Sequence, residues 1–167
     1  MAKHILNALV HNHAGILAKM AALFARRGFN IDSLAVGVTH NKEISSTTIV
    51  VDGDAQTVEQ VEKQLKKLID VIDVTTLSAE DSVSRELSLI KVSCTAKTRA
   101  EIVQIVNIFR ANIIDISDHA TIIELTGSAT KIDAFEEMMR PYNILEMSRT
   151  GMIAMSRSKS DSKRIDS

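Results

Sequence analysis

The chain has 167 residues, of which 45% are hydrophobic, so it can form one ordinary domain or two small ones with a buried core. A formal net charge of −1 and an aromatic content of 3% argue against a nucleic-acid-binding protein, which needs a basic face or aromatic side chains for stacking. The one cysteine, Cys94, cannot form an intramolecular disulfide bond, and no run approaches the roughly 18 apolar residues of a membrane span.

The first half of the chain predicts six elements in the order β-α-β-β-α-β. They are a strand at 3–10, a helix at 15–28, strands at 29–39 and 44–54, a helix at 57–70 and a strand at 71–77. The first helix is predicted from the helical spacing of its apolar residues and from Gly28, which is suited to end it. Thr57 and Gln60 form a predicted capping box for the second helix. His11-Asn12-His13 interrupts the first apolar stretch, so no signal peptide is predicted and we expect a cytoplasmic protein.

The same order repeats in the second half. The predicted strands are 86–94, 111–118, 120–127 and 144–157, the last one with a bend at Gly151. Two helices lie between them, predicted to be capped by Thr98 with Glu101 and by Thr130 with Asp133, and Pro141 marks the end of the second. The predicted fold class is therefore α+β, with two ferredoxin-like βαββαβ domains in tandem at 1–78 and 84–157. Residues 158–167 have no apolar periodicity, and we expect a disordered tail.

Catalytic motifs are missing from the sequence. It contains no phosphate-binding P-loop, no GxSxG, no HExxH and no CxxC. His11 and His13 have no third metal ligand nearby, and Cys94 lies in an apolar strand. No catalytic residue, metal site or bound cofactor is predicted, which favours a binding role.

One loop is a candidate binding site. Gly15 lies at the predicted start of the first helix, where free N–H groups and the positive end of the helix dipole suit a carboxylate. The amides of Asn12 and Asn30 could bind a zwitterion, and Ile16, Leu17 and Ile31 could hold an aliphatic side chain. The spacing alone fits a simple capping loop equally well.

These residues resemble a known family. The segments Asn12–Leu17 and Leu23–Gly37, which contain the run RRGFNIDSLAVG, closely resemble the regulatory small subunit of acetohydroxyacid synthase (acetolactate synthase). The resemblance continues through Glu124–Gly127 and Arg149–Gly151 and covers about residues 3–157. It implies that the first domain is an ACT domain.

The resemblance also implies a function. Members of this family are not catalytic: they bind and activate a large subunit that holds thiamine diphosphate, magnesium and FAD, and they confer feedback inhibition by valine or another branched-chain amino acid. Their ACT domains form a homodimer, with the effector at the helix start of one chain and against the other. Carried over, the effector site comprises Asn12, Ala14, Gly15, Ile16, Leu17, Asn30 and Ile31.

Four positions depart from the family pattern. Ala14 stands where many members have proline, Ser46-Thr47 replaces a common Arg-Met pair, and Met152 replaces a usual arginine. Alternative functions are a stand-alone ACT-type amino-acid sensor with a different partner and, less favoured, a small enzyme on the same fold. A ferredoxin-like fold does not by itself distinguish them.

Overall fold

The computed structural model describes residues 2–158, which form two compact units. The first contains the residues up to Ser84 together with the segment that begins at Gly151, and the second is Arg85–Thr150. Each unit has the βαββαβ order, so the predicted fold class is confirmed. No helix among the described residues is long and apolar enough to cross a membrane.

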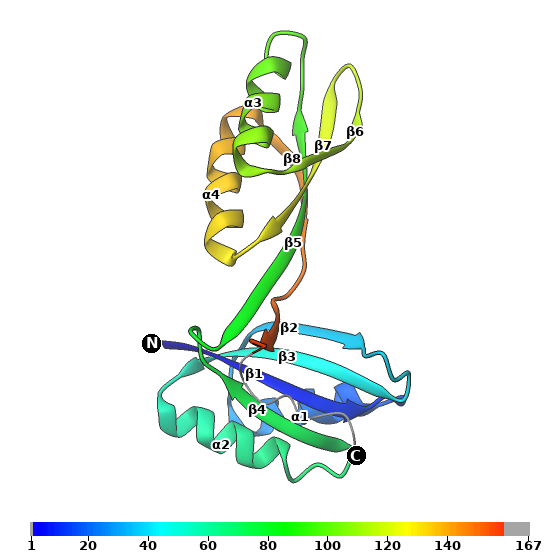
Figure 1. Ribbon diagram of the computed structural model, residues 1–167, viewed down its shortest axis with the longest axis vertical. Coiled ribbons are helices and arrows are strands. Elements are labelled where there is room, and N and C mark those ends of the chain that lie inside the picture. Colours follow the sequence, from blue (N-terminus) through cyan, green and yellow to red (C-terminus); the bar gives the residue numbers. More distant parts are fainter. Residues whose placement is uncertain (1, 159–167) are drawn as a thin grey trace. The chain divides into compact units, whose positions relative to one another are not determined.

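The first unit is a four-stranded antiparallel sheet with two helices on one face (Figure 1). Its elements are β1 (Ala2–His11), α1 (Ile16–Arg27), β2 (Ile31–Val38), β3 (Ile44–Gly53), α2 (Ala55–Leu65) and β4 (Val71–Leu77). The strand order is β2-β3-β1-β4, so β2 and β4 are the edges.

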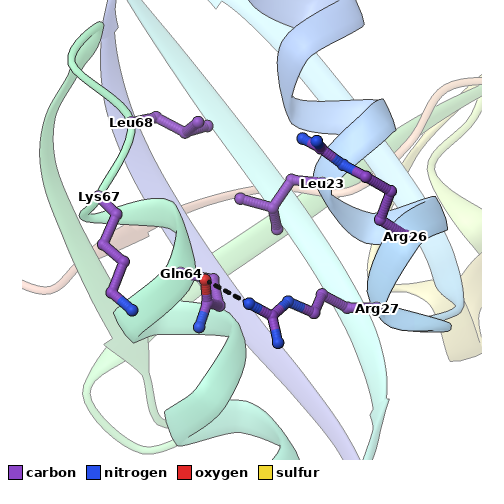
Figure 2. Close-up of a pocket in the computed structure, with 6 residues that line it drawn as sticks. All are labelled: Leu23, Arg26, Arg27, Gln64, Lys67 and Leu68. Atoms are coloured by element: carbon purple, nitrogen blue, oxygen red, sulfur yellow. Dashed lines mark hydrogen bonds between the residues drawn. The ribbon is translucent and has the colours of Figure 1, made fainter.

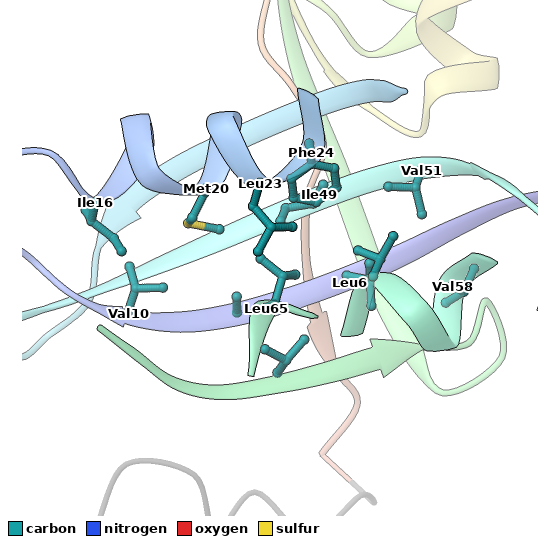
Figure 3. Close-up of a cluster of buried hydrophobic side chains, with 13 residues drawn as sticks. Leu6, Val10, Ile16, Met20, Leu23, Phe24, Ile49, Val51, Val58 and Leu65 are labelled. Atoms are coloured by element: carbon teal, nitrogen blue, oxygen red, sulfur yellow. The ribbon is translucent and has the colours of Figure 1, made fainter. Parts of the chain in front are cut away.

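Alternation along the strands builds the core of this unit. Leu6, Ala8 and Val10 on β1, with Ile49 and Val51 on β3, face the helices and are almost fully buried. The helices contribute their apolar stripes to the same cluster (Figure 3). The helical contributors are Ile16, Met20, Leu23, Phe24, Val58, Val61 and Leu65. α1 ends as predicted, because Gly28 adopts a left-handed conformation with φ 68°.

The second unit repeats this plan with its own core. Its elements are β5 (Ser82–Ser93), α3 (Arg99–Phe109), β6 (Asn112–Ile116), β7 (Ala120–Gly127), α4 (Ala129–Met139), the 3-10 turn η1 (Arg140–Tyr142) and β8 (Ile144–Arg149). The strand order is β6-β7-β5-β8. Phe135, Ile132 and Met139 of α4 are fully buried against the sheet.

Two of the three predicted N-cap residues, Thr57 and Thr130, are wrong. Asp54, not Thr57, caps α2: its carboxylate accepts a hydrogen bond from the Thr57 N–H at 2.7 Å. Ser128, not Thr130, caps α4 by accepting from the Lys131 N–H at 3.3 Å. The N-cap of α3 is Thr98, but its side chain makes no capping hydrogen bond.

The predicted last strand is split in two. β8 ends at Arg149, and a separate strand, β9 (Ile153–Ser156), belongs to the first unit and pairs with β5, whose residues 82–84 also belong to the first unit. The structure therefore differs from the predicted domain 84–157, because the chain after Thr150 makes hydrogen bonds with Asn7, Ser33, Thr48 and Asp81 of the first unit. Of the predicted tail, residues 159–167 lie outside the described residues.

Candidate functional site

The start of α1 is open at Gly15. This residue is the N-cap with φ 90°, in the left-handed region that glycine adopts without strain, and no side chain caps the helix. A Cβ added at Gly15 would meet no atom within 4 Å. The Ile16 N–H has only a long contact of 3.5 Å with the His13 carbonyl. The first turn therefore leaves donors and space for an anionic group.

Asn12 holds the loop in front of this helix. Its N–H donates to the Glu43 carbonyl at 2.7 Å, and its Nδ2 donates to the Lys42 carbonyl at 2.9 Å. The amide group thus anchors the loop to the β2–β3 connection and does not cap α1. No hydrogen bond to its Oδ1 is found among the described residues, so this oxygen can accept from a ligand.

Three charged side chains gather beside the helix start, and the sequence did not predict them as a group. The Asp70 carboxylate accepts from His13 Nε2 at 2.6 Å and from Lys19 Nζ at 2.7 Å. His13 Nδ1 also lies 3.0 Å from the Ala14 carbonyl, so both ring nitrogens have acceptors and the charged imidazolium fits best. Asp70 is 57 residues from His13, and no local pattern links them.

The pKa values of this cluster shift in the directions that its contacts require. The pKa of His13 is raised, first by the Ala14 carbonyl and then by Asp70. The pKa of Asp70 is lowered, first by Lys19 and then by His13. When His13 is protonated, the cluster carries a net charge of +1 and favours an anion at the adjacent helix start.

The predicted site residues fall into two groups in one chain. Ile16 is buried in the core and Leu17 is 45% exposed, next to Gly15. Asn30 and Ile31 lie at the opposite end of the sheet: Ile31 pairs with Val51. The end of β1, where the α1 loop begins, pairs instead with the start of β3. α1 separates the two groups, since its 12 residues span about 18 Å.

A bulge follows the second group. The β2–β3 register shifts between Ile31 and Ser33, so Asp32 is the extra residue. The Asp32 carboxylate accepts from Asn30 Nδ2 at 3.2 Å and pairs with Lys3 Nζ at 3.2 Å. Ile31 packs against the core of the unit.

A basic hollow lies between the C-terminal ends of α1 and α2 (Figure 2). Its volume is about 430 Å³, and it is lined by Leu23, Arg26, Arg27, Gln64, Lys67 and Leu68. Arg27 donates to Gln64 Oε1 at 3.3 Å, and Arg26 Nε donates to the Ala22 carbonyl at 3.3 Å. It contains none of the predicted site residues.

No group of three or more metal-ligating side chains is found in the part of the chain that the structure describes. The buried Cys94 belongs to the core of the second unit.

Comparisons with known proteins cover both halves of the chain. A family model described as "AHAS small subunit-like ACT domain" matches residues 6–73, and one described as "Small subunit of acetolactate synthase" matches residues 85–158. The chain is 52% identical over 155 residues to the probable acetolactate synthase small subunit of Archaeoglobus fulgidus, covering 93% of this chain and 97% of the relative. It is 47% identical over 154 residues to the acetolactate synthase small subunit of Mycobacterium bovis, covering 92% of each.

A solved structure agrees over nearly the whole length. The crystal structure of the acetolactate synthase small subunit from Thermotoga maritima matches with a TM-score of 0.89 and 44% sequence identity. The match covers 94% of this chain and 98% of that one.

Proposed function

Because this chain belongs to the acetolactate synthase small-subunit family, we propose that it activates a catalytic large subunit and makes that subunit sensitive to valine or another branched-chain amino acid. The family resemblance seen in the sequence is confirmed by these matches. In this proposal the reaction and its cofactors, thiamine diphosphate, magnesium and FAD, belong to the large subunit. The two proteins would meet in the cytoplasm.

The observation that carries the effector role is the open start of α1 at Gly15. The carboxylate of an α-amino acid would accept from the first N–H groups of the helix, next to the cluster of His13, Lys19 and Asp70. The ammonium group would donate to Asn12 Oδ1, and the exposed side of Leu17 would contact the aliphatic side chain.

A homodimer would complete this site. β2 is an edge strand with Val36 and Val38 48% and 57% exposed, so its outer backbone groups can pair with a second copy. A two-fold axis would pair the two β2 strands antiparallel and place the start of one beside the end of the other. Asn30 and Ile31 of one chain would then approach Gly15 of its partner. The two groups of site residues, which lie at opposite ends of the sheet within one chain, would meet across the dimer.

The test is a reconstitution assay with the large subunit from the same organism, supplied with its cofactors. We expect no acetolactate from this chain alone, a higher turnover number when both proteins are present, and a decrease when valine, leucine or isoleucine is added. Turnover by this chain alone, without an effect on the large subunit, would contradict the proposal.

The alternative is a stand-alone amino-acid sensor with a different partner. The match of residues 85–158 to the small-subunit family model argues against it, because that region lies outside the ACT domain. A pulldown from cell extract distinguishes the two: we expect a thiamine-diphosphate-dependent large subunit to be recovered with the chain.

A further inference from the structure

The segment 151–156, here called the C-terminal strap, crosses the face of the first sheet that the helices leave uncovered. Asn7 and Thr48 alternate with helix-facing residues of β1 and β3, so they lie on this open face. The Ala154 N–H donates to Thr48 Oγ1 at 3.2 Å, and Asn7 Nδ2 donates to the Ala154 carbonyl at 3.4 Å. The strap is thus bound to the central strands through side chains, and its strand β9 also pairs with β5.

The strap also contacts the edge strand β2. The Met152 N–H donates to Ser33 Oγ at 2.9 Å. One residue earlier, a Cβ added at Gly151 would lie 2.4 Å from the Leu34 carbonyl oxygen, so the two backbones touch there. Two successive strap residues therefore meet two successive residues of β2.

These contacts adjoin the second group of the effector site. Only the bulge residue Asp32 separates Ser33 from Ile31. A bulge residue is left out of the strand ladder, so the position of the chain before it depends on how the chain after it is held. The Met152–Ser33 hydrogen bond is one of the contacts that hold it.

We propose that Ser33, held by the Met152 N–H of the strap, is a positioning residue for the Asn30–Ile31 half of the effector site. The inference rests on the proposed function, since it assumes that these residues contact an amino acid. Linkage makes the effect reciprocal: if the strap contacts favour the binding geometry, the bound amino acid strengthens those contacts. An amino acid should therefore slow hydrogen exchange at the Met152 amide.

The experiment compares Ser33→Ala with Thr48→Val in the full-length chain. Both remove a side-chain acceptor of a strap N–H, but only Ser33 is next to the bulge. Calorimetry with valine, leucine and isoleucine in turn should show about three- to tenfold weaker binding for Ser33→Ala, the effect of one hydrogen bond. Thr48→Val should bind within about twofold of the unmodified chain, and Ser33→Thr, which keeps the hydroxyl, should restore the affinity.

Hydrogen exchange followed by NMR gives a readout besides affinity. In the unmodified chain the amino acid should slow exchange of the Met152 amide, and in Ser33→Ala this protection should be lost. Unchanged affinity in Ser33→Ala, or equal weakening in Thr48→Val, would overturn the positioning role. If the unmodified chain binds none of the three amino acids, the effector proposal itself fails and this inference with it, a result visible without any variant.

Discussion

Gly15 combines an open backbone with a conformation that other residues adopt at a cost. Its φ of 90° places it in the left-handed region, and the space around its Cα is empty. We predict that Gly15→Asp weakens amino-acid binding at least tenfold, because its carboxylate would occupy the N–H groups of the ligand site and repel the ligand. Activation of the large subunit should persist. Calorimetry and the reconstitution assay measure the two effects.

Gly15→Asn is the matched control for this substitution. Asparagine and aspartate have similar size and tolerate the left-handed conformation similarly, at roughly 1 kcal/mol. The difference between the two variants therefore isolates the charge. Equal affinities in both variants would show that backbone strain, not the carboxylate, causes the loss.

The His13–Asp70 pair predicts a pH dependence. Because the folded-state pKa of His13 is raised above 6.5, its contribution to stability is fully present below about pH 6.5 and is lost as the pH rises through the raised value. The pKa of Asp70 is lowered from 3.8, so its contribution is present above about pH 3.8 and is lost as the pH falls through the lowered value. An NMR titration should place the midpoint of His13 above 6.5.

Asp70→Asn should lower that midpoint without removing the whole shift, since the Ala14 carbonyl is the larger cause. Glu59→Gln removes the same charge from the Lys63 pair on α2 and should leave His13 unchanged. If the titration midpoint of His13 is the same in Asp70→Asn as in the unmodified chain, the 2.6 Å contact does not persist in solution.

At the residue scale, the features predicted correctly from the sequence are those that depend on residues close together in the chain. Gly15 at the helix start and Gly28 at its end follow from local backbone preferences, and both are confirmed. The partner of His13 is contributed by the loop before β4, and the helical periodicity of the chain carries no information about that pairing.

The helix caps show the same limit at the scale of elements. The pattern of Thr followed three residues later by Gln or Asp is present, but Asp54 and Ser128 stand a few residues earlier and start the helices sooner. An earlier cap lengthens the helix by hydrogen bonds that the later start would leave unmade. Several residues near a helix start can act as caps, and the sequence does not rank them.

We predict that Ser128→Ala lowers the free energy of unfolding of the second unit by about 1 kcal/mol, the usual effect of an N-cap. Thr130→Ala lies inside α4 and should change it by less than about 0.5 kcal/mol. Tyr142, the only tyrosine of a chain without tryptophan, lies in the second unit, so its fluorescence during urea unfolding reports that unit. A larger loss of unfolding free energy in Thr130→Ala than in Ser128→Ala would support Thr130, the residue predicted from sequence, as the cap.

The split of the predicted strand 144–157 into β8 and β9 depends on residues that are distant in the sequence. Gly151 was a visible bend position, but the destination of the following residues is set by Ser33, 119 positions earlier. The predicted strand 144–157 has strand-like composition on both sides of the break. Composition alone does not show to which sheet each side belongs.

For the whole molecule, the proposed dimer is tested at the edge of β2. We predict that Val36→Lys combined with Val38→Lys gives a monomer in light scattering and abolishes amino-acid binding, because charges on an edge strand oppose pairing with a second copy. Ile108→Lys, on the second unit and 76% exposed, is the control and should leave the mass unchanged. A dimer that survives the double substitution would place the interface elsewhere.

At this scale the repeat of two βαββαβ units was predictable from hydrophobic periodicity and turn residues. Which residues make up the first unit was not predictable in the same way. That unit is assembled from two stretches of chain, which the whole second unit separates in the sequence. A predicted boundary in a polar link assumes that each domain is continuous.

That discontinuity has a consequence for synthesis on the ribosome. The first unit lacks its strap until Arg85–Thr150 has been translated, which takes roughly 3–13 s at about 5–20 residues per second. During that interval Leu9, Val50 and Leu77, at most 7% exposed in the finished protein, lie on an uncovered sheet face. A chain released by premature termination before Gly151 would keep this apolar face uncovered, and exposed apolar surface of this kind promotes aggregation and chaperone binding.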